Sequence, residues 1–256
     1  MPFQYVSVDE AMQRGGLRMM VVGGVPSPWG EAAKGILHIK GIEWVAVRLA
    51  YDSEPLKNWA GERSGPVAMY EQEPPRSGWN EILLLAERLA PKPALLPADQ
   101  AECTLAMSLA HEICGEAGLA WSRRLQLIHA GLQNAGGFPE RVAKYLGKKY
   151  GYIPALGADS SMRVAELVGM LVARLKAQRE AGSRYYVGDA LTAVDIYSAT
   201  VTAMFGALPA DQCKMDTAMR AAFETRDAQI EAALDPILFA HRDMMYAKHL
   251  ELPLSL

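Results

Sequence analysis

The stretch that decides the fold is YYVGDALTAVDIYSAT, Tyr185 to Thr200. Its Gly188-Asp189 pair is typical of a turn. Thr192 and Asp195 have the spacing of a helix capping box, with Asp in place of the usual Glu, and Leu191 has the spacing of a hydrophobic staple to the helix that follows. The pattern predicts the start of a buried helix, and a role in stabilising the fold instead of in chemistry.

Around this stretch the second half of the chain reads as helix. Apolar residues recur every three or four positions, as in VAELVGMLVARL, which indicates amphipathic helices sharing one core. The predicted helices are Asp99–Gly118, Leu119–Leu132, Pro139–Tyr150, Ser161–Ala181, Thr192–Phe205, Asp216–Ala233 and Asp235–Leu250.

The first half alternates between short strands and helices. The predicted strands are Leu17–Val22, Trp44–Leu49 and Pro66–Tyr70, and the predicted helices are Pro28–Lys40 and Glu81–Leu89, with a short extra helix capped by Ser7 and Glu10. This order predicts a compact α/β domain. Three prolines in APKPALLPAD, Ala90 to Asp99, argue against regular structure and predict a linker.

Composition excludes several classes of protein. The chain has 256 residues, half of them hydrophobic, and a net charge of −3, so a nucleic-acid footprint is not indicated. No apolar stretch reaches the roughly 18–20 residues that span a bilayer. The N-terminal residues lack the apolar segment of a signal peptide, so we expect a cytoplasmic protein. The three cysteines and five histidines have no metal-ligand spacing, so we expect reduced thiols and no metal site.

A second stretch, VVGGVPSPWG, Val21 to Gly30, predicts a strand that ends at glycines and feeds a helix. Such a junction can hold an anion at the helix N-terminus. The glycine spacings of the dinucleotide-binding and P-loop motifs are absent. Ser27 is a good N-cap and Pro28 a good first helical residue. Ser27 therefore either caps its own helix or donates a hydrogen bond to a bound anion.

Three pieces of the sequence resemble the glutathione transferase superfamily. SPWGEAAKGILHIKGIEW is similar to that family's first helix and second strand, GPVAMY to its third strand with a cis-proline, and YVGDALTAVDIYSA to the capping motif of its helical domain. The resemblance runs from about Leu17 to about Leu250 and is most specific in the capping motif.

The resemblance implies a thioredoxin-like α/β domain over residues 17–90 and an all-α domain over residues 100–256. Residues 1–16 would be an N-terminal extension and residues 91–99 the linker. Such proteins are usually homodimers, and a groove between the domains holds glutathione as co-substrate together with an electrophilic, apolar small molecule. The implied activity is a glutathione transferase of the serine type, as used in detoxification.

The same resemblance implies a set of site residues. Ser27 falls on the catalytic serine, which donates a hydrogen bond to the glutathione thiolate. The other positions are the backbone of Gly65 before the cis-proline candidate Pro66, Glu81 and Ile82 for the γ-glutamyl end, Arg76 and Asn80 as compensating polar groups, and Trp29 and Trp121 in the acceptor pocket. No cysteine lies before the linker, so a glutaredoxin-like thiol exchanger is excluded.

One departure from the family pattern keeps a second class open. The family usually has Glu-Ser at the start of the helix after the fourth strand, and the best match here is Glu81-Ile82, in which Ile82 lacks a side-chain donor. The chain is therefore either an enzyme or a fold that has lost glutathione and serves as a binding or scaffold protein. A glutathione-binding carrier of apolar ligands is a third reading.

Overall fold

The computed structural model of the protein describes residues 3–256. Within them the strands form one four-stranded sheet in the order β1-β3-β2-β4, where β1 is Tyr5–Val6, β2 Leu17–Val21, β3 Trp44–Arg48 and β4 Val67–Tyr70. β1 and β2 run parallel to β3, and β4 runs antiparallel to β2. Arg76 adds one antiparallel bridge to Ala68 of β4.

Helices cover both faces of the sheet, because every residue of the strand β2 is buried. Leu17, Met19 and Val21 of β2 pack in one hydrophobic cluster with α2, Pro28–Ile39, and α4, Trp79–Leu89. Met20, on the opposite face, packs with α1, Val8–Gln13, and α3, Glu54–Ala60. Alternate residues of a strand point to opposite faces, so β2 is buried on both sides.

The predicted strands and helices of this half are confirmed within one or two residues, and two elements were missed. β1 is only two residues long and gives no alternation to recognise. α3 gives no apolar periodicity in the sequence, because most of its residues are exposed and only Leu56 and Ala60 are buried. The short helix predicted after Ser7 is α1, and Ser7 Oγ accepts a hydrogen bond from Glu10 N at 3.1 Å.

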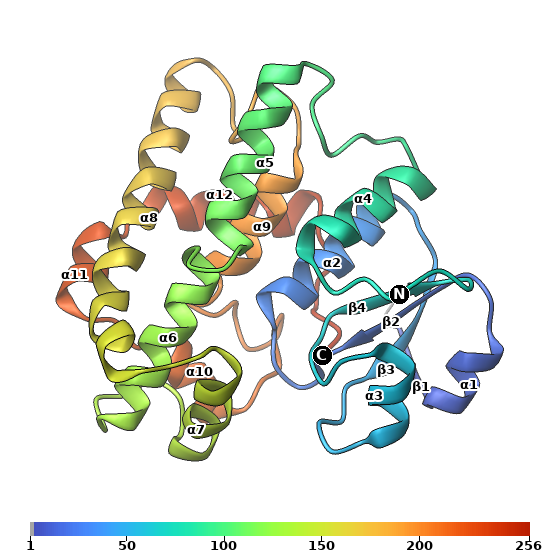
Figure 1. Ribbon diagram of the computed structural model, residues 1–256. Coiled ribbons are helices and arrows are strands. Elements are labelled where there is room, and N and C mark those ends of the chain that lie inside the picture. Colours follow the sequence, from blue (N-terminus) through green and yellow to red (C-terminus); the bar gives the residue numbers. More distant parts are fainter. Residues whose placement is uncertain (1–2) are drawn as a thin grey trace.

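The rest of the chain is helical and lies beside the sheet domain (Figure 1). Its elements are α5 Gln100–Cys114, α6 Leu119–Leu132, α7 Glu140–Lys149, α8 Pro154–Glu180, α9 Ala193–Thr202, α10 Thr217–Glu224, α11 Ala228–Ala233 and α12 Pro236–Lys248.

Several predicted helices have different bounds in the structure: α5 ends at Cys114 instead of Gly118, α9 ends at Thr202 instead of Phe205, and two others differ more. α8 begins at Pro154, at a position that suits proline, and not at Ser161. The segment predicted as one helix over Asp216–Ala233 is two, because the chain leaves helical geometry at Thr225 and Asp227 caps α11 by accepting from Ile230 N at 3.0 Å.

The buried helix predicted from the decisive stretch is α9, in which every residue is buried. It packs against α2, α5 and α12. Asp195 is fully buried and accepts hydrogen bonds from the backbone N–H groups of Tyr186 and Thr192, both at 2.9 Å. His241 of α12 lies 3.0 Å from the same carboxylate. The carboxylate thus joins the turn, the start of α9 and α12.

The proline-rich segment between the two halves is held in place by one lysine. Lys40 Nζ donates to the carbonyl oxygens of Ala90 and Pro93 at 2.7 and 2.9 Å and pairs with Glu87 at 2.8 Å. The carbonyl of Leu95 accepts from Ala193 N, which fixes the segment to the start of α9. The exact domain bounds of residues 1–16, 17–90, 91–99 and 100–256 remain predictions.

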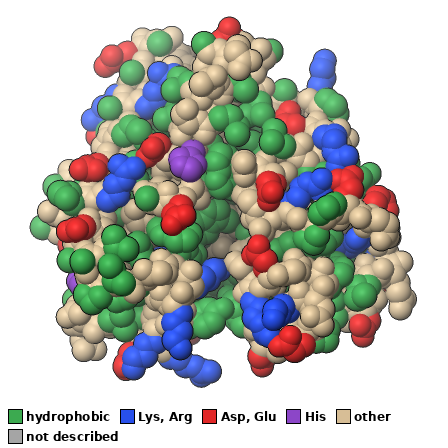
Figure 2. Space-filling view, in the orientation of Figure 1, with side chains coloured by type: hydrophobic (Ala, Val, Ile, Leu, Met, Phe, Trp, Pro, Cys, Tyr) green, Lys and Arg blue, Asp and Glu red, His purple; other side chains and the backbone are tan. Residues whose placement is uncertain are grey.

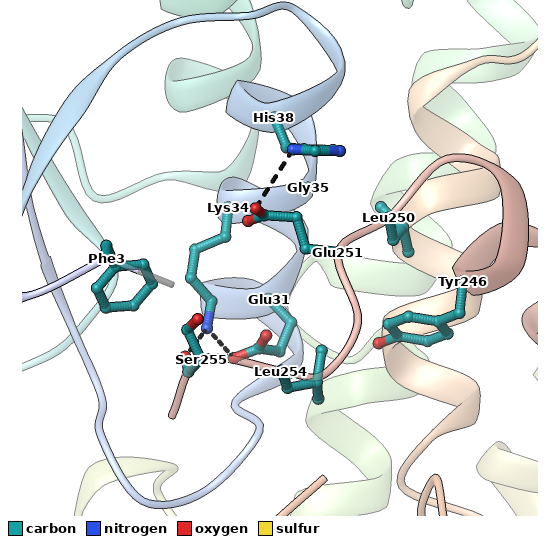
Figure 3. Close-up of a pocket in the computed structure, with 10 residues that line it drawn as sticks. All are labelled: Phe3, Glu31, Lys34, Gly35, His38, Tyr246, Leu250, Glu251, Leu254 and Ser255. Atoms are coloured by element: carbon teal, nitrogen blue, oxygen red, sulfur yellow. Dashed lines mark hydrogen bonds and ion pairs between the residues drawn. The ribbon is translucent and has the colours of Figure 1, made fainter. Parts of the chain in front are cut away.

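The C-terminal tail lies across α2 (Figure 3). Lys34 Nζ donates to the carbonyl of Ser255 at 2.8 Å and pairs with Glu31 at 2.6 Å. Leu254 N donates to the carbonyl of Gln212 at 2.7 Å. A side chain at Gly35 would collide with Leu250, so the small residue allows the tail to approach the helix.

None of the helices described between residues 3 and 256 is long and apolar enough to span a membrane.

Candidate functional site

A cleft of about 450 Å³ lies between the sheet domain and the helical domain. Figure 2 shows a hollow with hydrophobic side chains between the two halves. The cleft is lined from the sheet domain by Trp29, Glu62, Ser64, Gly65, Pro66, Ser77, Gly78, Trp79 and Asn80, and from the helical domain by His111, Cys114, Gly115, Glu116, Trp121, Lys149 and Tyr150.

Aromatic rings form one wall of the cleft and connect its two sides. Tyr150 stacks with Trp29 at a centroid distance of 6.2 Å and meets Trp121 edge-on at 4.7 Å. Trp29 Nε1 donates to the carbonyl of Cys114 at 2.9 Å, which fixes α2 to the end of α5. The structure therefore brings the two predicted acceptor-pocket residues, Trp29 and Trp121, into the same cleft.

Gly65 and Pro66 also lie in the cleft, and the peptide bond between them is cis, as the resemblance implied. A Cβ atom at Gly65 would lie 3.3 Å from the carbonyl oxygen of Met20 and 3.5 Å from the backbone of Val21. The glycine thus permits a close approach to β2. Within residues 3–256 its own N–H and C=O make no backbone hydrogen bond, so both are available to a ligand.

The start of α4 corrects the alignment made from sequence. The helix begins at Trp79, and Glu81 is its third residue, whose carboxylate accepts from Gly78 N at 2.8 Å. Ile82 is buried in the core, and its N–H donates to the carbonyl of Gly78 within the helix. Neither the side chain nor the N–H of Ile82 reaches the cleft. The N–H groups of the first helical turn, which lack helical partners, lie beside the cleft at Trp79 and Asn80.

The two predicted compensating residues are separated by the fold. Asn80 lines the cleft, whereas Arg76 is outside its lining and pairs with Glu73 at 2.5 Å. Ser77 does line it, and Ser77 Oγ donates to Glu62 Oε1 at 2.8 Å. Among the described residues Glu62 forms no ion pair, so a carboxylate without a counter-ion stands next to the start of α4.

Ser27 is the N-cap residue of α2, and its side chain makes no capping hydrogen bond. The residue is buried, and its carbonyl accepts from Glu31 N at 2.7 Å. Ser27 is not among the residues that line the cleft, although Trp29, two residues later, is. The hydroxyl is thus free to donate at a helix N-terminus next to the cleft.

The buried thiol in the cleft has no sign of reactivity. Burial raises the pKa of Cys114 well above its ordinary value, so the residue remains a protonated thiol at neutral pH. All three cysteines are free. Among residues 3–256 no group of three or more His, Cys, Asp or Glu side chains is placed to hold a metal ion.

Sequence reasoning missed several residues of the cleft. Trp79 was missed because the helix was expected to begin at Glu81; a glutamate three residues after Gly78 was the available signal for the earlier start. Glu62, Lys149 and Tyr150 had no such signal, because only the packing of α6 and α7 beside the sheet domain brings them together.

The comparisons with solved structures agree on the architecture. A glutathione S-transferase from Methylobacterium radiotolerans in complex with glutathione sulfonate is 20% identical, with 91% of each chain covered and a TM-score of 0.59. A glutathione S-transferase domain-containing protein from Marinobacter aquaeolei is 16% identical, covering 90% of this chain and 98% of that one, with a TM-score of 0.62. The rice protein GST1 in complex with glutathione is 19% identical over 94% of both chains, with a TM-score of 0.59.

The sequence matches no protein-family model, and the comparison with curated proteins finds no similar sequence. The structural similarity, together with the sheet order and the buried capped helix, establishes the architecture: the chain has the glutathione S-transferase fold.

Proposed function

We propose that the protein binds glutathione in the cleft and activates its thiol for attack on an electrophilic small molecule. The observation that carries the proposal is the arrangement at the cleft: the open backbone of Gly65 and the start of α4 line one hollow between the two domains. The Ser27 hydroxyl, which makes no capping hydrogen bond, lies at the start of α2, two residues before the cleft-lining Trp29. Two of the structural neighbours named above are complexes with glutathione or its sulfonate, which supports the choice of ligand.

Each end of the tripeptide has a partner of suitable chemistry. The N–H and C=O of Gly65 suit the backbone of the cysteinyl residue. The N–H groups at the start of α4 suit the γ-glutamyl carboxylate, since a helix N-terminus attracts anions. Glu62, held by Ser77 Oγ beside this helix, suits the γ-glutamyl ammonium group. These assignments replace Glu81 and Ile82, because the Glu81 carboxylate and the Ile82 N–H make hydrogen bonds to Gly78 at the start of α4.

Ser27 would stabilise the thiolate by a hydrogen bond. A free thiol has a pKa near 8.5, and lowering it by about two units takes roughly 2.7 kcal/mol. A hydrogen bond to a charged acceptor contributes about 1.5–3 kcal/mol, and a helix N-terminus roughly 0.3–1 kcal/mol more. The serine and the start of α2 are together sufficient. The thiol proton leaves to water, and the thiolate sulfur forms the new bond to the electrophilic carbon. In a displacement the leaving group departs from that carbon as an anion with the electron pair of the broken bond. In an addition the π electrons move to the neighbouring atom, which takes up a proton from water.

The test is a calorimetric titration of glutathione into the wild-type protein and Ser27→Ala, with thiolate absorbance followed against pH. We expect binding in both, and a bound-thiol pKa that is lowered in the wild type and rises by about one to two units in Ser27→Ala. Ser122→Ala, a buried serine on α6 outside the cleft lining, is the matched control. An unchanged thiol pKa in Ser27→Ala would refute the role of the serine.

The binding or scaffold alternative rested on Ile82, and the structure places this residue in the core of the sheet domain, away from the cleft. The departure from the family pattern thus does not weaken the cleft, and the enzyme is the reading we favour. Absence of glutathione binding at millimolar concentration would reverse this choice in favour of a scaffold. Saturable binding of apolar ligands without product would favour the carrier.

A further inference from the structure

Beside the helical wall of the cleft, although not among the residues that line it, lies a buried arginine without an ion-pair partner among the described residues. Arg124 of α6 is only 7% exposed, and its Nε atom is buried without a hydrogen-bond partner. Its guanidinium lies over the rings of Phe138 and Phe223 at 5.4 and 5.9 Å. Among residues 3–256 no carboxylate pairs with it. Two aromatic faces do not fully replace the hydration that a buried charge loses, so this position favours an anionic ligand.

Arg124 belongs to the cleft side of its helix. It follows Trp121, which lines the cleft, by three residues, and residues three apart share a helix face. Its charge acts on Lys149 and Tyr150, two other cleft-lining residues, and on Tyr51 of the loop before α3. The charge of Arg124 thus acts at the end of α7 and at the facing loop of the sheet domain.

Lys149 adds a second cation to the same wall. Loss of hydration, followed by the charge of Arg124, lowers the pKa of Lys149 to about 8, and Glu62 across the cleft opposes this shift. Burial raises the pKa of both Tyr150 and Tyr51, so the two phenols are neutral at physiological pH. Unlike Arg124, Lys149 is an exposed residue, and its Nζ lies 5.5 Å from the centroid of the Tyr150 ring. It lines the cleft and has no ion pair among the described residues, so its amine is open to an anionic ligand.

We propose that Arg124 and Lys149 form a carboxylate-binding subsite of the cleft, and that the second substrate is a small aromatic or unsaturated carboxylate whose flat part lies against Trp121 and Tyr150. The inference deepens the proposed function and rests on it for the identity of the reaction. It changes the expected acceptor from a purely apolar molecule to an anionic one, because an apolar molecule would leave the buried guanidinium of Arg124 without an ion-pair partner.

The test compares trans-cinnamate with the uncharged trans-cinnamamide as probes, by calorimetry at pH 7, with and without saturating glutathione. The variants are Arg124→Met, Arg124→Lys and Lys149→Met; Lys148→Met, an exposed neighbour outside the cleft lining, is the matched control. We expect the wild type to prefer cinnamate at least about tenfold, the two Met variants to lose this preference, and Lys148→Met to keep it. Arg124→Lys retains the positive charge but loses the planar guanidinium that donates two hydrogen bonds, so we expect it to keep part of the preference for cinnamate.

The pH dependence gives a second readout. Cinnamate affinity of the wild type should fall as the pH rises through 8, because Lys149 loses its proton there, and Lys149→Met should lack this fall. Equal affinity for acid and amide, or Met variants that bind cinnamate like the wild type, would overturn the proposal.

Two further outcomes show whether the subsite binds a carboxylate of glutathione or the carboxylate of a second substrate. If glutathione displaces cinnamate and the same variants weaken glutathione binding, the subsite holds a carboxylate of glutathione, and the anionic acceptor is refuted. If cinnamate binds as expected but glutathione does not bind at all, the subsite stands while the proposed transferase function fails.

Discussion

At the scale of single residues, buried charges organise this protein. Asp195 is the clearest case, since its two carboxylate oxygens accept from Tyr186 N, Thr192 N and Thr192 Oγ1, and His241 pairs with it in the core. Such a carboxylate is stable in the interior because its acceptors are occupied. Arg124 is the opposite case, a buried charge without a partner, and it is therefore the residue that indicates a ligand.

Replacing Asp195 tests the first case. In Asp195→Asn one oxygen becomes an amide donor, which would face a backbone N–H donor of Tyr186 or Thr192. We expect a loss of about 3 kcal/mol or more in the free energy of unfolding, measured by urea denaturation. Asp189→Asn, an exposed position in the same motif, should change it by less than about 0.5 kcal/mol. Equal stability of the two variants would contradict the assigned role of Asp195.

At the scale of elements, α2 owes its environment to the C-terminal tail. Glu31 and Lys34 lie in its first half beneath Leu254 and Ser255, and Figure 3 shows both side chains enclosed between the helix and the tail. Burial raises the pKa of Glu31, although the charge of Lys34 opposes the rise. The helix that presents Ser27 to the cleft is thus covered on its far side by the end of the chain.

The titration of Glu31 gives a prediction with a definite sign. Its pKa is higher in the folded than in the unfolded state, so the folded state binds the proton more tightly. The stability of the wild type relative to Glu31→Gln is the difference between their free energies of unfolding. This difference should fall as the pH rises from about 4.5 through the folded-state pKa of Glu31, because the carboxyl then loses its proton in the buried site. Urea titrations across pH 4 to about 8 measure it, with the exposed Glu43→Gln as control. A pH-independent difference would contradict the burial of the carboxylate.

At the scale of the whole molecule, two domains enclose the cleft, and neither contains it alone. We propose in addition that the protein forms a homodimer through α4 and α5, because Leu84 of α4 is 50% exposed and Leu105 of α5 is 36% exposed. Exposed large apolar side chains on neighbouring elements are typical of interaction surfaces.

The proposed dimer can be tested by sedimentation velocity. Sedimentation velocity should give a dimer for the wild type, and Leu84→Lys should shift it toward the monomer. Leu156→Lys on α8, where the side chain is 49% exposed, serves as control and should leave the dimer intact. A monomeric wild type at micromolar concentration, or equal dissociation in both variants, would refute this surface.

The candidate site was only partly predictable from sequence. Gly65, Pro66, Asn80, Trp29 and Trp121 were named from sequence and line the cleft. Arg76, Glu81 and Ile82 were named too, but are not among the residues that line the cleft. α4 begins two residues earlier than expected, so Glu81 and Ile82 are its third and fourth residues, whose groups bond within the helix, and Arg76 precedes the helix and pairs with Glu73.

The sequence by itself determined the division of the chain into an α/β half, a linker and a helical half, since local signals suffice for it: the capped helix at Thr192, the apolar periodicity of the helical half and the proline-rich linker each act over a few residues. Only the tertiary structure decided which side chains share the cleft. Arg124, Lys149 and Glu62 are far apart in the chain, and their electrostatic roles depend on burial and on the absence of a partner, which arise when the two domains pack together.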